Sequence, residues 1–439
     1  MDIKVVKFGG TSLGSPERMK NIPKIINLDE KQIVVLSAIS GTTNSLSQIG
    51  KAFLAGNKEE ARVKILELKN FYEKFTGDLL STEQSKQEAE KILKIHFDLL
   101  LSFGFIEFGV KEEKLVLAQG ELLSTQIFFA YLKEINIKAE LLPALEFMRL
   151  DENQEPDILF IQETLIPIIN ARSFEKIFIT QGYICKNSYG EVDNLKRGGS
   201  DYSASLIGAG LQAEEIQIWT DIDGMHNNDP RIVENTKPVS FLSFEEAAEL
   251  AYFGAKILHP QSVLPAQKYH VPVRILNTLE PFAQGTLIGL KGEEEDIKSI
   301  AAKDKIVALR IHSSRMLLAY GFLRRIFEVF ERFKTPIDMI TTSEVSVSVT
   351  IDDTTYLTEI LKELEDFGRV DVDLNQTIIC IVGNFTAKKP GMAEKVFSCL
   401  KQVPLRMISY GGSEHNMSIL VDSIKKNEVL ISLHAGLYN

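Results

Sequence analysis

Short apolar runs alternate with a helical pattern at the start of the chain. Residues 3–8 and 32–37 are rich in β-branched side chains and are bounded by glycine or polar turn residues, as buried strands are. Between them, residues 17–28 carry apolar side chains at helical spacing. This order predicts a strand–helix–strand unit at the N-terminus.

The pattern changes between about residues 56 and 112. This region is rich in Lys and Glu, and its apolar residues have the spacing of amphipathic helices rather than the alternation of strands. We expect a helical insertion there.

Strand patterns return after the insertion and again alternate with helical ones. The expected strands are 176–184, 215–224 and 271–277, with helix-like segments such as 201–211 and 243–252 between them. Regular alternation of this kind favours a parallel sheet with helices on both faces. The predicted fold class is therefore α/β, with a three-layer α/β/α sandwich around a mainly parallel sheet.

A charged stretch without a clear pattern, around residues 290–299, ends this series. We place the main domain boundary there. The predicted organisation is a first domain over 1–290, a linker over 291–302 and two smaller units over 303–372 and 373–439.

The two smaller units are predicted because the C-terminal part of the chain repeats itself. A shift of 70 residues aligns Val307–Asp352 with Thr377–Asp422 without a gap, so that Gly321 meets Gly391. Each copy has the pattern strand, helix, strand, strand, which predicts two related α+β units. In each copy a glycine precedes the helix, where free backbone N–H groups can receive a carboxylate.

Composition limits the possible partners and the compartment. The chain has 439 residues, 49 basic and 60 acidic side chains and a formal net charge of −11, which argues against nucleic-acid and acidic-membrane partners. Its three cysteines are far apart in sequence and fit neither a disulfide framework nor a zinc site, so we expect reduced thiols. No apolar run reaches the roughly 18 residues of a membrane span. We expect a soluble, cytoplasmic protein.

The first candidate for chemistry is the sequence KFGGTS at the end of the first predicted strand. Lys7 ends the strand at the carboxyl edge, where open α/β sheets bind ligands. Gly9 and Gly10 would let backbone amides approach a phosphate, and Thr11 and Ser12 offer hydroxyl donors. The order differs from a Walker loop, in which the lysine follows the glycines. By itself this pattern also suits a lysine that is only a solvated surface charge.

Three later stretches add groups that suit phosphoryl transfer. Residues 195–205 contain a second glycine pair that opens a helix, residues 219–231 place several aspartates after a strand, and residues 253–260 contain a further lysine. Lysines, glycines and aspartates in these places are what positioning and charge stabilisation of a phosphoryl group require.

Taken in order, these motifs are recognisable. The sequences KFGGTS, QGE, RGGSDYSA, WTDIDG, NNDPR, FGAKILHP and TTSEVSVS occur in one register along the chain. In this the chain closely resembles, over essentially its whole length, the aspartate kinases of the amino acid kinase family, and specifically the monofunctional lysine-sensitive class. The resemblance implies an amino acid kinase sandwich followed by two ferredoxin-like ACT units. It also implies ATP-dependent phosphorylation of L-aspartate to 4-phospho-L-aspartate, with ATP and Mg²⁺ as cofactors, on the route to lysine, threonine and methionine.

The resemblance also implies roles for individual residues. Lys7 would contact the transferring phosphoryl group, Gly9 and Gly10 would form the phosphate-facing turn, and Asp201 would hold the lysine in place. Glu121 would receive the substrate ammonium. The implied substrate contacts are Ser37, Thr43, Glu121, Arg197 (which would clamp the α-carboxylate) and Ser200. The implied nucleotide contacts are Lys7, Thr220, Asp221, Arg231 and Lys256.

Elementary chemistry agrees with this reaction. The β-carboxylate of aspartate is ionised at pH 7 and is already a nucleophile, so the reaction requires no general base. The difficulty is the repulsion between this carboxylate and the γ-phosphate, which lysine and Mg²⁺ would offset.

The repeated C-terminal units predict regulation. By resemblance to ACT domains, the first unit would bind L-lysine at the seam between two copies of the chain in a homodimer, with Asp338 receiving the ε-ammonium. The implied lysine contacts are Met316, Gly321, Phe322, Leu323, Asp338, Ser343, Glu344 and Val345. Ala319 departs from a serine common in lysine-sensitive relatives. The second unit has no acid at the position matching Asp338, so we expect no similar site there.

Other interpretations remain open at this point. A related kinase for N-acetylglutamate or glutamate would keep the lysine and glycine loops, but would lack the helical insertion and the C-terminal pair. A non-catalytic amino-acid sensor would keep the pair but lose the charges of the kinase site. Glu121 could be a solvated helix residue, His259 a loop hydrogen-bonder and Asp229 a turn former, while Gly208–Ala213 would serve helix packing. The chain length leaves no room for a fused homoserine dehydrogenase domain.

Overall fold

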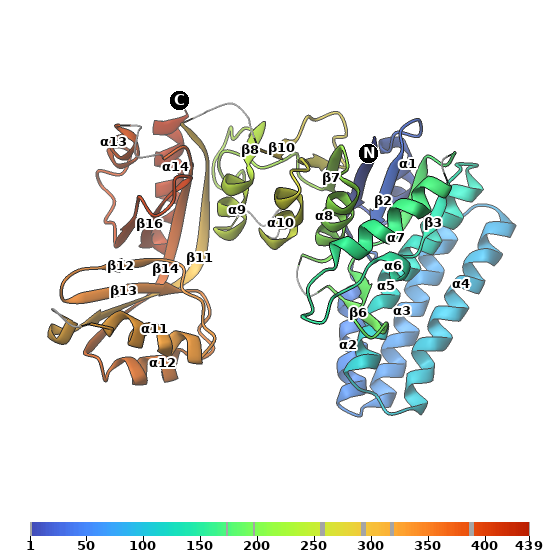
Figure 1. Ribbon diagram of the computed structural model, residues 1–439, viewed down its shortest axis with the longest axis horizontal. Helices are drawn as coiled ribbons and strands as arrows, with labels where there is room; N and C mark the ends of the chain where they lie inside the picture. Colours follow the sequence, from blue (N-terminus) through green and yellow to red (C-terminus); the bar gives the residue numbers. More distant parts are fainter. Residues whose placement is uncertain are drawn as a thin grey trace. The chain divides into compact units, whose positions relative to one another are not determined.

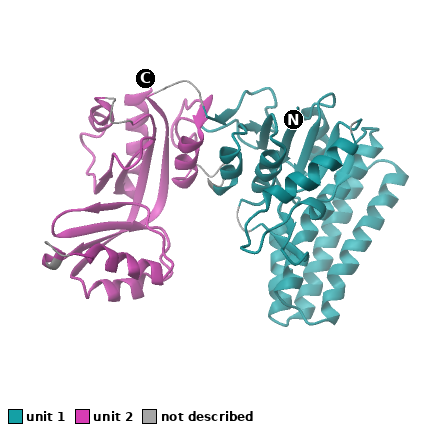
Figure 2. Cartoon of the chain, viewed as in Figure 1, with its two compact units in different colours: residues 1–225, 258–292 teal, residues 226–257, 293–439 magenta. Residues whose placement is uncertain are grey.

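Two compact units make up the chain in this computed structural model. The structure describes residues 2–172, 174–195, 198–254, 260–290, 296–316, 320–385 and 390–438. The first unit comprises residues 1–225 and 258–292, and the second comprises residues 226–257 and 293–439 (Figure 2). Each unit is described separately below.

A mostly parallel sheet lies at the centre of the first unit. Its strands are β1 (Lys4–Phe8), β2 (Gln32–Leu36), β3 (Glu140–Leu142), β4 (Ile177–Gln181), β7 (Glu215–Thr220), β9 (Val273–Asn277) and β10 (Thr286–Gly289), in the spatial order β3-β4-β2-β1-β7-β9-β10. All neighbouring pairs are parallel except β9 and β10. Every residue of β2 and β4 is buried, as expected for strands covered on both faces. The predicted parallel α/β fold is confirmed.

Helices cover both faces of this sheet (Figure 1). They are α1 (Pro16–Ile25), α2 (Thr42–Leu54), α3 (Lys58–Leu79), α4 (Glu83–Ser102), α5 (Val110–Glu134), α6 (Ala144–Phe147), α7 (Ile158–Ala171), α8 (Gly199–Leu211) and α10 (Pro260–Lys268). The expected helical insertion is confirmed as α3 and α4, which pack side by side with α5. On the opposite face, α8 approaches so closely that a Cβ on Gly208 would overlap the side chain of Ile216. The interpretation of the glycine-rich sequence at Gly208 as helix packing is therefore correct.

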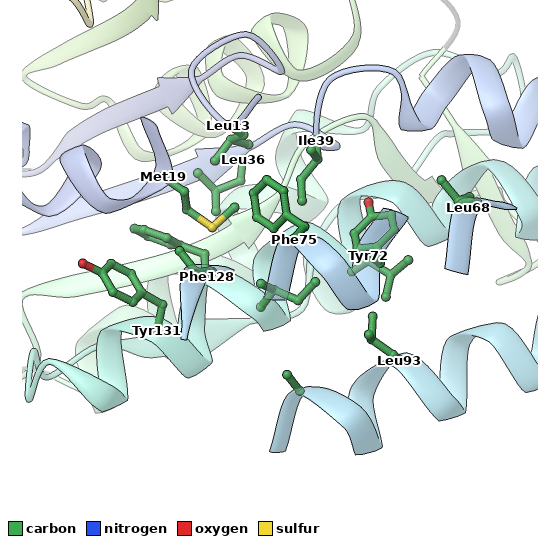
Figure 3. Packing of buried hydrophobic residues seen from close by; sticks show 14 of the residues in the cluster. Leu13, Met19, Leu36, Ile39, Leu68, Tyr72, Phe75, Leu93, Phe128 and Tyr131 are labelled. Carbon is green, nitrogen blue, oxygen red and sulfur yellow. The ribbon is translucent and has the colours of Figure 1, made fainter. Parts of the chain in front are cut away.

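A large core of the first unit lies between the sheet and the helices α3, α4 and α5. Figure 3 shows Leu36 of the sheet and Phe75 of α3 directed into the same apolar cluster as Phe128 of α5. Tyr72 is also fully buried there, and its hydroxyl lies 2.9 Å from Oγ1 of Thr42. The insertion is thus an integral part of the first unit's core.

Helix α5 has the length and hydropathy of a membrane span, and 72% of its most apolar window is buried inside the protein. It packs against α2 and α4 and contributes buried side chains such as Ile127 and Phe128 to the core. We therefore assign α5 as a core helix of the first unit.

The second unit is built around a six-stranded antiparallel sheet. Its elements are β8 (Phe241–Ser243), α9 (Phe244–Tyr252), β11 (Ile297–His312), α11 (Phe322–Arg332), β12 (Ile340–Thr342), β13 (Ser346–Ile351), α12 (Leu357–Leu364), β14 (Arg369–Gly383), α13 (Met392–Ser398), β15 (Met407–Ser409), β16 (Asn416–Asp422) and α14 (Lys426–Leu437). The sheet order is β12-β13-β11-β14-β16-β15. The predicted α+β region after the first domain is confirmed.

Two long strands join the repeated halves of this sheet. β11 and β14 run antiparallel over most of their lengths, from the pair Ile297 and Gly383 to the pair His312 and Arg369. One end of this ribbon packs under α11 and α12, and the other under α13 and α14. Residues 297–302, which we expected to form a linker, belong to β11, while residues 291–295 lie outside the described residues.

Candidate active site

Lys7 lies on the face of the sheet that α8 covers. In register across the sheet, Lys7 is aligned with Val35 of β2 and Ile218 of β7. Its ammonium forms an ion pair with the carboxylate of Asp201 in the first turn of α8, and the Lys7 side chain is only 11% exposed. The sequence alone left open a solvated surface lysine, and this burial excludes that alternative.

The glycines that follow Lys7 allow a very close turn. A Cβ on Gly9 would lie 3.3 Å from Nζ of Lys7, and a Cβ on Gly10 would lie 3.1 Å from the carbonyl oxygen of Ala38. Thr11 is exposed, whereas Ser12 is buried, and its Oγ has no partner within the described residues. The backbone of the loop therefore passes so close to Lys7 and Ala38 that side chains larger than glycine would be crowded at positions 9 and 10.

Glu121 lies on the other side of the sheet edge, in the middle of α5. Its Oε1 accepts the backbone N–H of Ala38 at 3.2 Å, and its Oε2 is buried without a partner among the residues that the structure describes. Burial raises the pKa of the Glu121 carboxyl to about 8, although the backbone N–H of Ala38 acts in the opposite direction. The alternative that Glu121 is a solvated helix residue is therefore wrong. Glu121 is a buried acid, and one of its oxygens has no hydrogen-bond partner among the described residues.

Gly120 brings α5 to this position. A Cβ on Gly120 would lie 2.8 Å from the Cβ of Ala38, so only glycine lets the helix approach the loop after β2. We predict that Gly120→Ala moves α5 away from this loop and raises the KM for the substrate whose ammonium Glu121 is expected to receive, with loss of about 1–3 kcal/mol of stability. The measurement is steady-state kinetics together with thermal unfolding.

Gly77 in α3 supplies the control for this change, because a Cβ there meets nothing within 4 Å. Gly77→Ala is expected to leave KM unchanged. Equal effects of the two substitutions would contradict the role assigned to Gly120.

The other implied substrate contacts differ in how deeply they are buried. Ser37 is half-buried at the end of β2, and its carbonyl accepts the Ser124 hydroxyl at 2.7 Å. Ser200 is buried in the first turn of α8, where a Cβ on Gly182 would overlap it. Thr43 is exposed in the first turn of α2. Arg197 lies outside the described residues.

The implied nucleotide contacts fall in different parts of the chain. Thr220 ends β7 in the first unit, and its hydroxyl donates to Asp221 at 3.2 Å. Arg231 belongs to the second unit, is largely exposed and holds Asp229 through two hydrogen bonds, of 2.9 and 2.7 Å. Asp229 also accepts the backbone N–H of Arg231, so its interpretation as a turn former is correct. Lys256 and His259 lie outside the described residues.

Asp338, the residue expected to receive an ε-ammonium, already holds one from this chain. Its Oδ1 accepts Nζ of Lys303 at 2.6 Å and the hydroxyl of Tyr252 at 2.7 Å. Its side chain is fully buried, and its Oδ2 has no partner in the described parts of the chain. Lys303 also pairs with Asp352 at 2.9 Å. We expected Asp338 to be available to an external ammonium. Because Lys303 and Tyr252 occupy Oδ1, this expectation holds only for Oδ2.

The remaining residues of the expected lysine site flank α11 and the turn before β13. Gly321 precedes α11 in the left-handed conformation (φ 74°), Phe322 is buried, and Met316 and Leu323 are half-buried. The other three, Ser343, Glu344 and Val345, lie exposed in the turn between β12 and β13. Residues 317–319, and with them Ala319, lie outside the described residues.

Sequence reasoning missed Tyr183. This residue follows β4 in a left-handed conformation (φ 63°), and its backbone N–H donates to Oγ of Ser203 in α8 at 2.7 Å. Burial, reinforced by the charge of Glu121, raises the pKa of the Tyr183 hydroxyl to about 12. The sequence carried no signal for it, because Tyr183 fell inside the expected strand 176–184, whereas β4 ends at Gln181.

The sheet, the helical insertion and the lysine–glycine loop together define a kinase of the amino acid kinase class. A profile of the amino acid kinase family matches residues 2–277, and a profile described as an ACT domain matches residues 379–437. Among curated proteins, the chain is 34% identical to the lysine-sensitive aspartokinase 3 of Escherichia coli, over 100% of this chain and 99% of that protein. It is also 34% identical to aspartokinase 1, chloroplastic, of Arabidopsis thaliana, over 99% of this chain and 80% of that protein. The chain belongs to the aspartate kinases of the amino acid kinase family.

Solved structures show the same likeness over the whole chain. E. coli aspartokinase III in complex with lysine and aspartate (T-state) is 33% identical, with a TM-score of 0.84 and 100% of both chains covered. The same enzyme with aspartate and ADP (R-state) has a TM-score of 0.81. The aspartate kinase of Clostridium acetobutylicum is 25% identical, with a TM-score of 0.85 and 99% of both chains covered.

Proposed function

We propose that this chain transfers the γ-phosphoryl group of ATP to the β-carboxylate of L-aspartate and forms 4-phospho-L-aspartate. The observation that carries this proposal is the pair of groups at one edge of the sheet. The Lys7 ammonium, held by Asp201, would supply a fixed positive charge for phosphoryl oxygens, and Glu121 offers a buried oxygen without a partner among the described residues for an ammonium. Such a site selects an amino acid as phosphoryl acceptor.

The proposed step needs little chemistry from the protein. A β-carboxylate oxygen forms a bond to the γ-phosphorus while the bond to the β,γ-bridging oxygen breaks, and the electron pair leaves with ADP. Lys7 would stabilise the charge on the transferring group, and Asp201 holds the lysine in place. Mg²⁺ usually reaches such sites on the nucleotide phosphates and would offset their charge, so we assign it no protein ligand.

The remaining contacts complete the proposal. Arg197 would clamp the α-carboxylate, and Ser37, Thr43 and Ser200 would contact the amino acid. Gly9, Gly10, Thr11 and Ser12 would face the phosphates, and the proposed nucleotide contacts are Thr220, Asp221, Arg231 and Lys256.

ADP formation with a set of substrates tests this assignment. We expect turnover with L-aspartate and little turnover with succinate or N-acetyl-L-aspartate, because neither carries the ammonium that Glu121 would bind. L-Glutamate is the control for chain length. Equal rates with N-acetyl-L-aspartate would show that Glu121 does not select the ammonium.

We propose further that L-lysine inhibits the enzyme, by binding at the ACT region in a homodimer of a cytoplasmic enzyme. The support is the buried Oδ2 of Asp338, which has no partner among the described residues and can accept a hydrogen bond from an ammonium, and backbone N–H groups before α11 that can donate to a carboxylate. The proposed contacts of lysine are Met316, Gly321, Phe322, Leu323, Asp338, Ser343, Glu344 and Val345. Inhibition would act through a shift between two states, with a coupling of about 1–3 kcal/mol.

Asp338→Ala is predicted to abolish inhibition by L-lysine and to leave activity without lysine nearly unchanged. The measurement is a titration of wild type and variant with L-lysine and, separately, L-threonine. Asp352→Ala is the matched control, because it removes the other acid that contacts Lys303 and should preserve lysine inhibition. Inhibition of the wild type by threonine instead of lysine, or undiminished lysine inhibition in Asp338→Ala, would contradict the proposal.

A further inference from the structure

Asn194 has a buried side-chain amide, and none of the roles described above involves this residue. It ends β6 (Val192–Asn194) and is only 6% exposed. Both Nδ2 and Oδ1 of its side chain are buried without a hydrogen-bond partner among the described residues. A buried polar group without a partner is costly, and here donor and acceptor are both unpaired.

The neighbours of Asn194 place it beside the N-terminal half of α5, which also carries Glu121. The preceding residue, Asp193, forms an ion pair of 2.6 Å with Lys114 of α5, and β6 lies against that helix (Figure 1). Asn194 itself is aligned with Ile184 in the short antiparallel ribbon of β5 (Ile184–Lys186) and β6. Ile184 directly follows Tyr183, whose hydroxyl lies within the electrostatic influence of Glu121.

The chain beyond Asn194 leads directly into the substrate loop. The backbone N–H of Leu195 donates to the carbonyl oxygen of Tyr183 at 2.8 Å, so the chain is held in place as far as Leu195. In the sequence, Asn194 lies three residues before Arg197, which would receive the α-carboxylate.

Other buried polar atoms without partners gather around the same edge of the sheet. They are Oε2 of Glu121, Oγ of Ser12, Oγ1 of Thr180 and Oγ of Ser262. Thr180 is aligned with Val35, and Val35 with Lys7, so the Thr180 hydroxyl and the Lys7 side chain leave the same face of the sheet. Polar groups left unpaired in this way are typical of a site that a polar ligand completes.

We propose that the side-chain amide of Asn194 is a further contact of the amino-acid substrate, an inference that rests on the aspartate kinase activity proposed above. A zwitterionic amino acid supplies both partners that the amide lacks. Nδ2 donates to a carboxylate oxygen, and Oδ1 accepts from the ammonium. In the enzyme without substrate, the unpaired amide lowers stability at a site that function requires.

The test is Asn194→Leu, which preserves the approximate size of the side chain and removes both polar atoms. We expect the KM for L-aspartate to rise about 10- to 100-fold, the range for loss of a hydrogen bond to a charged group, with the KM for ATP unchanged. We also expect the variant without substrate to unfold at a higher temperature than the wild type. Asn194→Asp should raise the KM for aspartate further, because it places a negative charge beside a substrate carboxylate.

Gln32→Leu is the matched control. Gln32 is 3% exposed, and its Oε1 is also buried without a partner, but it lies at the amino end of β2, at the opposite edge of the sheet. Its replacement should leave the KM for aspartate unchanged. An unchanged KM for aspartate in an active Asn194→Leu enzyme would overturn the assignment, and so would an equal rise in the KM for ATP. A wild-type enzyme without activity toward L-aspartate would instead overturn the proposed function on which the assignment rests.

Discussion

Lys7→Ala is expected to lower kcat by about 10²- to 10³-fold, the loss typical for one charged group that stabilises a transition state. The same change should destabilise the protein, because it leaves the Asp201 carboxylate, which is 19% exposed, without its partner. We expect a loss of about 1–3 kcal/mol. From sequence alone, a lysine at a strand end predicts little effect on stability, and the buried ion pair corrects that expectation. Steady-state kinetics and chemical denaturation measure the two effects.

Lys4→Ala is the matched control for this prediction. Lys4 lies on the same strand, and its ammonium pairs with Glu30 at 2.7 Å at the amino end of the sheet. Turnover should remain close to that of the wild type. If Lys7→Ala retains normal turnover while Lys4→Ala does the same, Lys7 is structural and the phosphoryl role is wrong.

Glu121→Gln is expected to raise the KM for L-aspartate on the order of 10²-fold, because the substrate ammonium loses its only proposed carboxylate partner. The substitution preserves shape and the hydrogen bond from Ala38, so the fold should be retained. Kinetics at saturating ATP measure the change, and a KM within about twofold of the wild-type value would remove Glu121 from the substrate site.

The pH dependence of wild type and Glu121→Gln separates the charge of Glu121 from its shape. Because the pKa of Glu121 is raised to about 8 in the folded protein, the carboxyl is mainly protonated below that pH. An ammonium requires the ionised form, so the KM for aspartate should rise as pH falls from 9 to 6, by up to about tenfold per unit. The KM of Glu121→Gln should lack this dependence.

The stability of the folded protein should depend on pH in the opposite direction to substrate affinity. Affinity for aspartate should increase as pH rises, whereas stability should decrease. Between the ordinary pKa of a glutamate and about 8, the folded protein without substrate binds a proton that the unfolded chain releases. The contribution of this proton is fully present below the unfolded pKa and is lost as pH rises through 8. The advantage in melting temperature of Glu121→Gln over wild type should therefore grow between pH 5 and 8. A constant difference across this range would show that the carboxyl is ionised throughout.

The fold was largely predictable because its strands are short, apolar and separated by clear helical patterns. Runs such as residues 32–36 can only be satisfied by burial on both faces, and the gapless repeat at Gly321 and Gly391 determined the plan of the second unit. The ion pair between Lys7 and Asp201 joins the motifs KFGGTS and RGGSDYSA, which the sequence analysis had already assigned to one site.

The rest depends on contacts between residues far apart in the chain, for which sequence carries no local signal. Lys303 and Tyr252 meet at Asp338 through tertiary packing alone, so the acid looked available to an external ammonium. Sequence alone assigned no role to Asn194, and only its burial without partners among the described residues distinguishes it. The raised pKa of Glu121 likewise follows from the close approach at Gly120.

The most direct test of the central claim is the identity of the product. Purified enzyme, ATP, Mg²⁺ and L-aspartate are incubated with hydroxylamine, which converts an acyl phosphate into a stable hydroxamate. The account predicts the β-hydroxamate of aspartate, formed together with one ADP, and its loss in Lys7→Ala. ADP release without hydroxamate, or hydroxamate formed equally well from N-acetyl-L-glutamate, would contradict it.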